Sequence, residues 1–134
     1  MSRRAINDQQ FRAVRALPAA ERYGYFIRQV ADWQEVWSLR DDGGWRLVSD
    51  NQGHECVPVW PHERYATVHA TGDFADCRAE AISLEKWISE WLPGAIGRGW
   101  NIAVFPVVDG GERGVVVEPA SLESDLRAEL SQYE

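Results

Sequence analysis

The residues of this sequence best suited to metal binding are its histidines and cysteines. His54 and Cys56 are two residues apart and share one face of an expected strand. His62 and His69 are seven residues apart and share one face of an expected helix. Thiolates and imidazoles are the ligands that zinc prefers, so convergence of these side chains would form a zinc site. Their spacings match no established zinc module, and histidines that face solvent are common. We therefore expect no cofactor and keep His54, Cys56, His62 and His69 as an alternative metal site.

Nucleophilic catalysis would need Cys56 beside a histidine base, either His54 or His62. Such a site also requires a group that orients the base and an oxyanion hole, and neither is visible in the sequence. The sequence contains no GxSxG, HExxH or P-loop motif. A glycine-rich stretch at residues 94–99 follows a predicted helix and precedes a strand, the reverse of a dinucleotide fingerprint. We interpret that stretch as a helix end, predict no catalytic residue, and favour a protein that is not an enzyme.

A tryptophan at a predicted strand-to-helix corner is the first candidate for a binding surface. Trp60 ends the strand, and His62, Arg64 and Tyr65 follow within one helical turn and a half. Tryptophan is enriched at protein interfaces, where its ring anchors the contact and its N–H meets water. The sequence therefore predicts a surface for a protein partner formed by Trp60, His62, Arg64 and Tyr65. The alternative is a packed corner that has no partner.

The other tryptophans are interpreted first as core residues. Seven tryptophans in a chain of 134 residues are the unusual feature of the composition. Trp87 and Trp91 fall on an apolar helical stripe that starts at Leu84. Trp37 lies on an apolar strand face, and Trp45 can meet it across a hairpin. We therefore expect these four side chains to lie in the core.

Composition and charge limit the class of protein. The chain suits one domain, expected to span residues 1–134 with a flexible N-terminal arm at residues 1–6. The net charge of −7 argues against a nucleic-acid partner, because phosphate contacts need clustered Lys and Arg. The longest apolar run, residues 102–108, is far shorter than a bilayer span, and no secretory signal is visible. We expect an acidic cytosolic protein without a membrane partner that is a monomer or a homodimer.

Two apolar periodicities predict the secondary structure. Steps of three and four residues indicate helices over residues 8–16, 19–33, 62–69, 83–92 and from 119 onward. Steps of two indicate strands at residues 36–40, 45–48, 55–60, 102–107 and 114–117, with turns at 41–44, 50–53 and 109–113. No period is clear at residues 73–81. Clustered hairpins indicate an α+β fold whose sheet has about five mainly antiparallel strands, in the order ααβββααββα.

Single residues mark the ends of the predicted helices. Asn7 and Ser83 are predicted N-caps, because their short side chains can accept a hydrogen bond from the first helical turn. Pro93 is predicted to stop or kink its helix, because it lacks an N–H and its ring crowds the preceding turn.

The chain resembles a bacterial family called domain of unknown function 2750. The likeness runs from about residue 11 to residue 130, with the elements in order. It is carried by residues 21–23 (ERY), 32–37 (DWQEVW), 58–62 (PVWPH), 65–66 (YA), 91–93 (WLP), 104–106 (VFP) and 114–119 (GVVVEP). A fainter likeness joins residues 57–60 and 103–119 to the amino-terminal domain of the type III secretion enhancer family. The resemblance implies a small bacterial domain with no established activity, and it assigns no catalytic residue.

Two hypotheses follow. The first is a non-catalytic bacterial domain that binds a protein partner, as a regulator or an immunity-like protein. The alternative is a small enzyme or metal-binding protein that uses His54, Cys56, His62 and His69. They differ in the residues they require, because partner binding needs Trp60 whereas metal binding needs the histidines and Cys56.

Overall fold

The computed structural model describes residues 6–49, 53–107 and 115–133. The turn predicted at 109–113 and most of the turn at 50–53 lie outside the described residues, as do residues 1–5 of the predicted arm. Ile6, the last residue assigned to that arm, is buried, and its carbonyl accepts a hydrogen bond from Arg64. Ile6 is therefore part of the folded domain. No described helix has the length and apolar character needed to cross a membrane.

Two helices joined at Pro18 open the fold. α1 spans Asp8–Arg15 and α2 spans Ala19–Trp33, close to the bounds that the periodicity predicts. The predicted cap at Asn7 is confirmed, because its Oδ1 accepts a hydrogen bond of 2.7 Å from the Gln10 amide. Gln34 caps the end of α2, and its left-handed backbone (φ 63°) turns the chain into the first strand.

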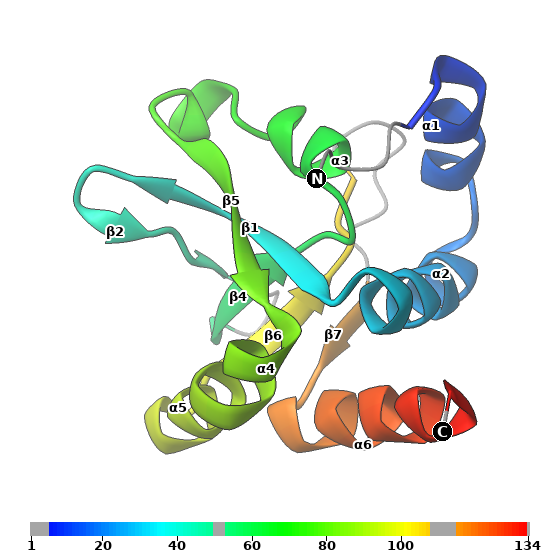
Figure 1. The fold of residues 1–134 in the computed structure, drawn as a ribbon. Helices are drawn as coiled ribbons and strands as arrows, with labels where there is room; N and C mark the ends of the chain where they lie inside the picture. Colours follow the sequence, from blue (N-terminus) through cyan, green and yellow to red (C-terminus); the bar gives the residue numbers. More distant parts are fainter. Residues whose placement is uncertain (1–5, 50–52, 108–114, 134) are drawn as a thin grey trace.

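Within the described residues, seven strands form two sheets rather than one sheet of about five strands. The first sheet has the order β2-β1-β5, from β1 (Glu35–Asp41), β2 (Gly44–Trp45) and β5 (Arg78–Ser83). The second has the order β3-β4-β6-β7, from β3 (Val48–Ser49), β4 (Glu55–Val59), β6 (Asn101–Val104) and β7 (Val115–Val117). An antiparallel bridge between Trp37 and Trp60 joins the two sheets. β1 of the first sheet lies beside β4 of the second (Figure 1).

The sheets confirm the α+β class, and they contain two features that the sequence did not predict. β4 and β6 pair in parallel, whereas the other strand pairs are antiparallel. β5 forms where no period was clear, and it places Ala81 opposite Trp37 and Ala79 opposite Leu39. The polar and apolar residues of β5 alternate, but the apolar positions at 79 and 81 are alanines, which have low strand propensity, so the pattern is weak.

One long helix runs from Ser83 to Gly99 in three segments. These are α4 (Leu84–Lys86), the π-helical turn η2 (Trp87–Trp91) and α5 (Leu92–Arg98). The predicted cap at Ser83 is confirmed, because its Oγ accepts a hydrogen bond from the Lys86 amide. Of the two alternatives predicted for Pro93, a stop or a kink of the helix, the stop is wrong, because α5 continues to Arg98. The wide turn directly before Pro93 accommodates a residue that lacks an N–H and crowds the preceding carbonyls.

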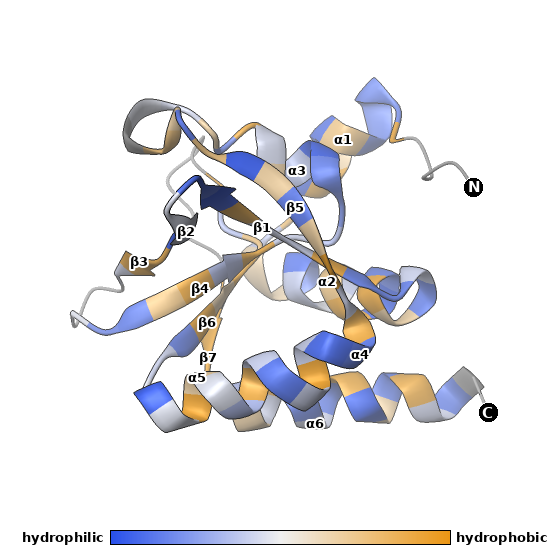
Figure 2. Ribbon diagram, turned by 60° about the vertical axis from the view of Figure 1, so that its left-hand side comes forward, coloured by the Kyte–Doolittle hydropathy of each residue, from blue (hydrophilic) through white to orange (hydrophobic). Residues whose placement is uncertain are grey.

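Shorter helices complete the fold. α3 (Glu63–Thr67) covers the middle of the helix predicted at 62–69 and is followed by the 3-10 turn η1 (Gly72–Phe74). The last helix, α6 (Pro119–Leu130), leads into η4 (Ser131–Tyr133). Leu122 and Leu126 of α6 are fully buried, and α6 packs against both α2 and α5. Hydrophobic and hydrophilic bands alternate along α5 and α6, which lie side by side beneath the second sheet (Figure 2).

Candidate functional site

A concave pocket lies between β2, β4 and the helix formed by η2 and α5. Its volume is about 410 Å³, within the range of protein sites that hold a small molecule. The lining includes three tryptophans and two charged residues, and its members are Trp45, Leu47, Val57, Glu90, Trp91, Gly94, Ala95, Arg98 and Trp100. We call this cavity the tryptophan pocket.

The indole rings of the tryptophan pocket are partly exposed. Trp45, Trp91 and Trp100 are half-buried, in contrast to Trp37 and Trp87, which are 3% and 0% exposed. Val57 and Ala95 are buried in the same lining, so the inner wall is apolar. The prediction that Trp37 and Trp87 lie in the core is therefore confirmed. For Trp45 and Trp91 the prediction is only half correct, because each ring also contributes exposed surface to the pocket.

The π turn explains why Trp91 leaves the core. The Leu92 amide donates to the Trp87 carbonyl, so the turn contains one residue more than an α-helical turn. The buried stripe of the helix consequently steps from Leu84 and Trp87 to Leu92 and Ala95. Trp91 would continue the stripe in a regular α-helix, but the extra residue rotates it toward the pocket. π turns inside α-helices occur frequently at functional sites.

Two arginines lie against tryptophan rings of the pocket. The guanidinium carbon of Arg98 is 5.1 Å from the centroid of Trp100, and that of Arg40 is 5.2 Å from the centroid of Trp45. Arg40 also forms an ion pair of 3.4 Å with Glu80 on the neighbouring strand β5. Arg98 Nη1 donates to the Gly94 carbonyl at 3.5 Å, the long limit of a hydrogen bond.

Glycine at position 94 keeps the helix side of the pocket open. A Cβ added at Gly94 would lie 3.2 Å from Arg98 Nη1, whereas a Cβ added at Gly97 would meet nothing within 4 Å. Gly99 has a φ of 73° and caps the helix. The glycine-rich stretch thus ends the helix at Gly99 and lines the pocket at Gly94.

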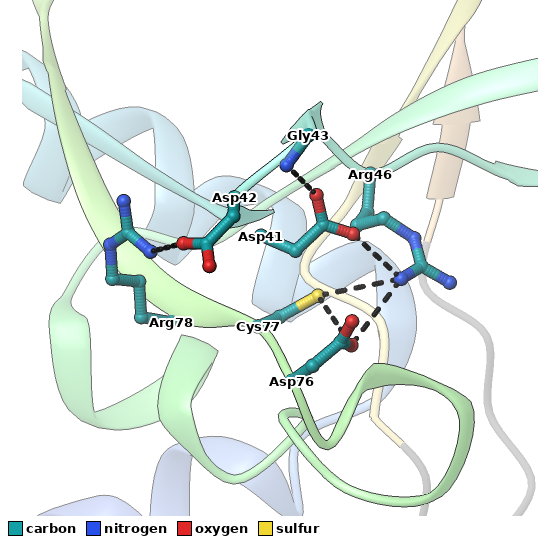
Figure 3. A network of polar contacts seen from close by, with 7 residues as sticks. All are labelled: Asp41, Asp42, Gly43, Arg46, Asp76, Cys77 and Arg78. Carbon is teal, nitrogen blue, oxygen red and sulfur yellow. Dashed lines mark hydrogen bonds and ion pairs between the residues drawn. The ribbon is translucent and has the colours of Figure 1, made fainter.

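A second polar cluster surrounds Cys77 (Figure 3). Carboxylate oxygens of Asp41 and Asp76 and the sulfur of Cys77 lie within 4.8 Å of one another. Arg46 contacts all three groups through Nη1, at 3.0 Å from Asp41, 3.5 Å from Asp76 and 3.9 Å from the sulfur. The Arg46 guanidinium already supplies the positive charge that a metal ion would otherwise bring to these three groups.

The electrostatics of this cluster favour a structural role. Burial raises the pKa of the Cys77 thiol, and the nearby Arg46 only partly opposes the rise. Hydrogen bonds from the Gly43 amide and from Arg46 lower the pKa of Asp41. A neutral thiol is a poor nucleophile and a poor metal ligand. The cluster therefore fixes the β1–β2 turn against the start of β5.

The structure buries most of the predicted surface around Trp60. Trp60 and Tyr65 are each 1% exposed, so the expectation that they form an exposed contact surface is wrong. Trp60 Nε1 donates to the Pro106 carbonyl at 3.0 Å instead of meeting water. Tyr65 stacks on Phe11 of α1, with ring centroids 5.5 Å apart. The corner is a core feature because α1, distant in sequence, covers it.

The remaining members of that predicted surface have structural roles. His62 is the N-cap of α3, and its Nδ1 accepts a hydrogen bond of 3.1 Å from the Arg64 amide. Arg64 donates to the Ile6 carbonyl at 2.6 Å and pairs with Asp8 at 2.5 Å. Its guanidinium also lies over the Phe11 ring, 4.3 Å from the centroid. Arg64 thus holds α1 and α3 together, and His62 caps α3.

The alternative metal site does not assemble. His54, Cys56, His62 and His69 all fall within the described residues, yet no three of them bring ligand atoms within 4.8 Å of one another. His54 is exposed before β4, whereas Cys56 is fully buried. The His69 ring packs on Trp60, with centroids 4.9 Å apart. The hypothesis of convergence is wrong, because His54 lies before β4 and is exposed, Cys56 is buried within β4, and His62 caps α3.

The apolar periodicity of the sequence does not reveal the pocket. It predicts no role for Trp100, Glu90 or Arg98, and for Gly94 it predicts only a helix end. One signal was present, because Pro93 falls inside an apolar stripe that continues beyond it, and a proline in that position is compatible with a widened turn.

The model of one protein family matches most of the chain. The model of a family described as "Protein of unknown function (DUF2750)" matches residues 23–126, which includes every residue of the tryptophan pocket. The resemblance inferred from the sequence is thereby confirmed. A search of curated proteins finds no match. The family description states no activity, so inference about function has to come from the geometry of the pocket.

Proposed function

We propose that this chain, which belongs to the DUF2750 family, is a non-catalytic binding domain whose ligand occupies the tryptophan pocket. One observation carries the proposal: three half-buried indole rings surround one cavity of about 410 Å³. Ligand pockets of that size are typically concave, mostly apolar and already formed before binding.

The composition of the lining supports binding rather than catalysis. The nine described residues of the lining include no serine, cysteine or histidine, which are the usual nucleophiles and bases. Its charged members, Glu90 and Arg98, stand at exposed positions of the helix. Such a lining gives an apolar body a place to stack and gives polar groups of the ligand two opposite charges to contact.

The exposed indole surface gives the free-energy reason for binding. Aromatic pairs contribute about 0.5–1.5 kcal/mol beyond the area that they bury. A planar ligand that covers Trp45, Trp91 and Trp100 gains this contribution from several rings and removes apolar surface from water. The edge-to-face contact of Trp45 with Trp91 holds two of these rings before the ligand arrives.

A protein partner is the second candidate, favoured by one residue beside the pocket. Ile96 of α5 is 55% exposed and directly follows Ala95 of the lining. A partner that inserts a side chain into the pocket would also cover Ile96. In either case we propose a domain of the bacterial cytosol that acts as a monomer or a homodimer.

The experiment compares two leucine substitutions on one helix. Gly94→Leu fills the tryptophan pocket, and the Arg98 end that it meets is flexible enough to move aside. Gly97→Leu adds the same side chain to the same helix in open space. Binding of 3-methylindole, a neutral planar probe, is followed through the tryptophan Nε1–H signals in nitrogen–proton NMR spectra.

The proposal predicts a clear difference between the two variants. The unmodified chain and Gly97→Leu bind the probe with shifts at the signals of Trp45, Trp91 and Trp100, and Gly94→Leu binds at least about tenfold more weakly. Equal binding by both variants, or shifts confined to other tryptophans, would show that the pocket is not the binding site.

A further inference from the structure

We infer that the ligand of the tryptophan pocket is a planar aromatic compound that carries a carboxylate, and that Arg98 binds this carboxylate. The inference rests on the proposed function and specifies its ligand. The observation behind it is the placement of two guanidinium groups against two of the three indole rings.

Arg98 is held where a ligand's anion would lie. Its side chain is exposed, it lines the pocket, and its guanidinium carbon lies 5.1 Å from the centroid of Trp100. Stacking on an aromatic ring restricts the guanidinium group but leaves the N–H donors at its edge available. Its hydrogen bond to Gly94 is long, at 3.5 Å, and no described carboxylate lies within ion-pair distance. The remaining donors can form a forked pair of hydrogen bonds with a carboxylate.

Glu90 forms no ion pair with Arg98 among the described residues. Arg98 Nη1 reaches back to the Gly94 carbonyl at 3.5 Å, and Glu90 lies one helical turn before Gly94. The pocket therefore has a positive end at Arg98 and a negative end at Glu90.

Arg40 makes the pocket less favourable for a cation. It lies over Trp45, and its partner Glu80 is 3.4 Å away and partly exposed. An aromatic ring attracts a cation through its face. In this pocket Trp45 and Trp100 already make that interaction with arginines of the chain, so a cationic ligand would meet like charges. The chain's net charge of −7 favours cations at long range, but screening leaves the nearby groups to decide the sign.

The test uses three probes that share the indole ring and differ in charge. Indole-3-acetate is an anion near neutral pH, 3-methylindole is neutral, and tryptamine is a cation. Dissociation constants are measured for the full chain by NMR titration of the tryptophan Nε1–H signals. We expect indole-3-acetate to bind most tightly, 3-methylindole less tightly and tryptamine most weakly.

Two arginine variants separate a specific contact from the overall charge. Arg98→Gln removes the proposed partner of the carboxylate. Arg28→Gln is the control, because Arg28 is exposed on α2, does not line the pocket and changes the net charge by the same unit. We expect Arg98→Gln to weaken indole-3-acetate about tenfold and to weaken 3-methylindole much less, because only the acetate loses a charge-assisted hydrogen bond. Arg28→Gln should change neither.

The outcomes distinguish this inference from the proposed function. Equal affinity for the acetate and the neutral probe, or tightest binding of tryptamine, would overturn the anionic ligand while the pocket remained a binding site. An equal loss of indole-3-acetate binding in Arg98→Gln and Arg28→Gln would overturn the role of Arg98. If none of the three probes shifts a pocket tryptophan, the proposed function fails together with the inference.

Discussion

The indole rings of Trp45 and Trp91 meet edge to face, with centroids 4.8 Å apart and an angle of 89° between their planes. Trp91 in turn stacks on Trp87, with centroids 5.7 Å apart. A chain of three rings thus leads from the β1–β2 hairpin, through the pocket wall, to a residue that is fully buried. Pocket and core are continuous, so the shape of the pocket depends on the packing behind it.

Substitutions at the two helix tryptophans should separate folding from binding. Trp87→Ala removes a fully buried ring and should lower the free energy of unfolding by about 3–5 kcal/mol. Trp91→Ala removes a half-buried ring and should cost only about 1–2 kcal/mol, since less apolar surface returns to water. Urea denaturation measures both values. Only Trp91→Ala should stay folded and lose 3-methylindole, and a larger stability loss for Trp91→Ala would contradict this division.

The sequence predicts the local features of the fold well, because they depend on neighbouring residues. The caps at Asn7 and Ser83 need only one short polar side chain before an amphipathic stretch. The β1–β2 hairpin and the paired Leu122 and Leu126 of α6 follow from apolar spacing in the same way.

Contacts between segments that are far apart in the sequence cannot be predicted from local patterns. The corner at Trp60 carries polar neighbours and resembles a surface, yet α1 covers it through Phe11 and Asp8. The parallel pairing of β4 with β6 forms across a long connection that contains α3, β5 and the long helix. The pocket is also not predictable from helical periodicity. The π turn contains one residue more than an α-helical turn, so Trp91 does not lie on the apolar stripe that a period of 3.6 predicts.

Arg22 should stabilise the fold through two backbone carbonyls. The side chain is 1% exposed, Nε donates to the Phe105 carbonyl at 3.3 Å, and Nη1 donates to the Leu17 carbonyl at 2.5 Å. Phe105 has a φ of 55°, so this contact holds a residue in an uncommon left-handed conformation. Arg22→Met keeps much of the apolar stem but removes the donors. It should lower the free energy of unfolding by about 2–4 kcal/mol, because two backbone carbonyls, one in a buried and one in a partly buried hydrogen bond, lose a charged donor.

Arg28→Met is the matched control for that measurement. Arg28 lies on the same helix and is exposed, so its substitution should change the free energy of unfolding by less than about 0.5 kcal/mol. Similar urea midpoints for the two variants would mean that the Arg22 hydrogen bonds contribute little.

The Cys77 thiol should react slowly at neutral pH. Burial raises its pKa above the ordinary value of 9.0, and the thiolate is the reactive form. In a Cys56→Ala chain, the rate of iodoacetamide labelling should therefore keep rising with pH beyond that value. Adding Arg46→Met removes the cation that lowers the thiol pKa and should move the profile to still higher pH. Rapid labelling at neutral pH would show that Cys77 is a thiolate and would reopen a reactive role for the cluster.

The acid stability of the chain should depend in part on Asp41. The Gly43 amide, at 2.8 Å, and Arg46, at 3.0 Å, hold the pKa of this carboxyl below its ordinary value of 3.8. A carboxyl whose pKa is lower in the folded chain contributes stability above its unfolded pKa, and that contribution disappears as the pH falls through the folded pKa. Asp41→Asn should therefore lower the melting temperature near neutral pH, and the gap to the unmodified chain should close below about pH 4.

Asp42→Asn serves as the control for this pH dependence. The Asp42 carboxylate is fully exposed and pairs with Arg78 at 3.4 Å on the surface, an arrangement that contributes little. The melting temperature of the Asp42→Asn variant should therefore equal that of the unmodified chain at every pH. The charge of Asp41 contributes only while the carboxyl is ionised. If the difference in melting temperature between Asp41→Asn and the unmodified chain stays constant from neutral to acid pH, the charge does not contribute and the side chain stabilises the turn by hydrogen bonding alone.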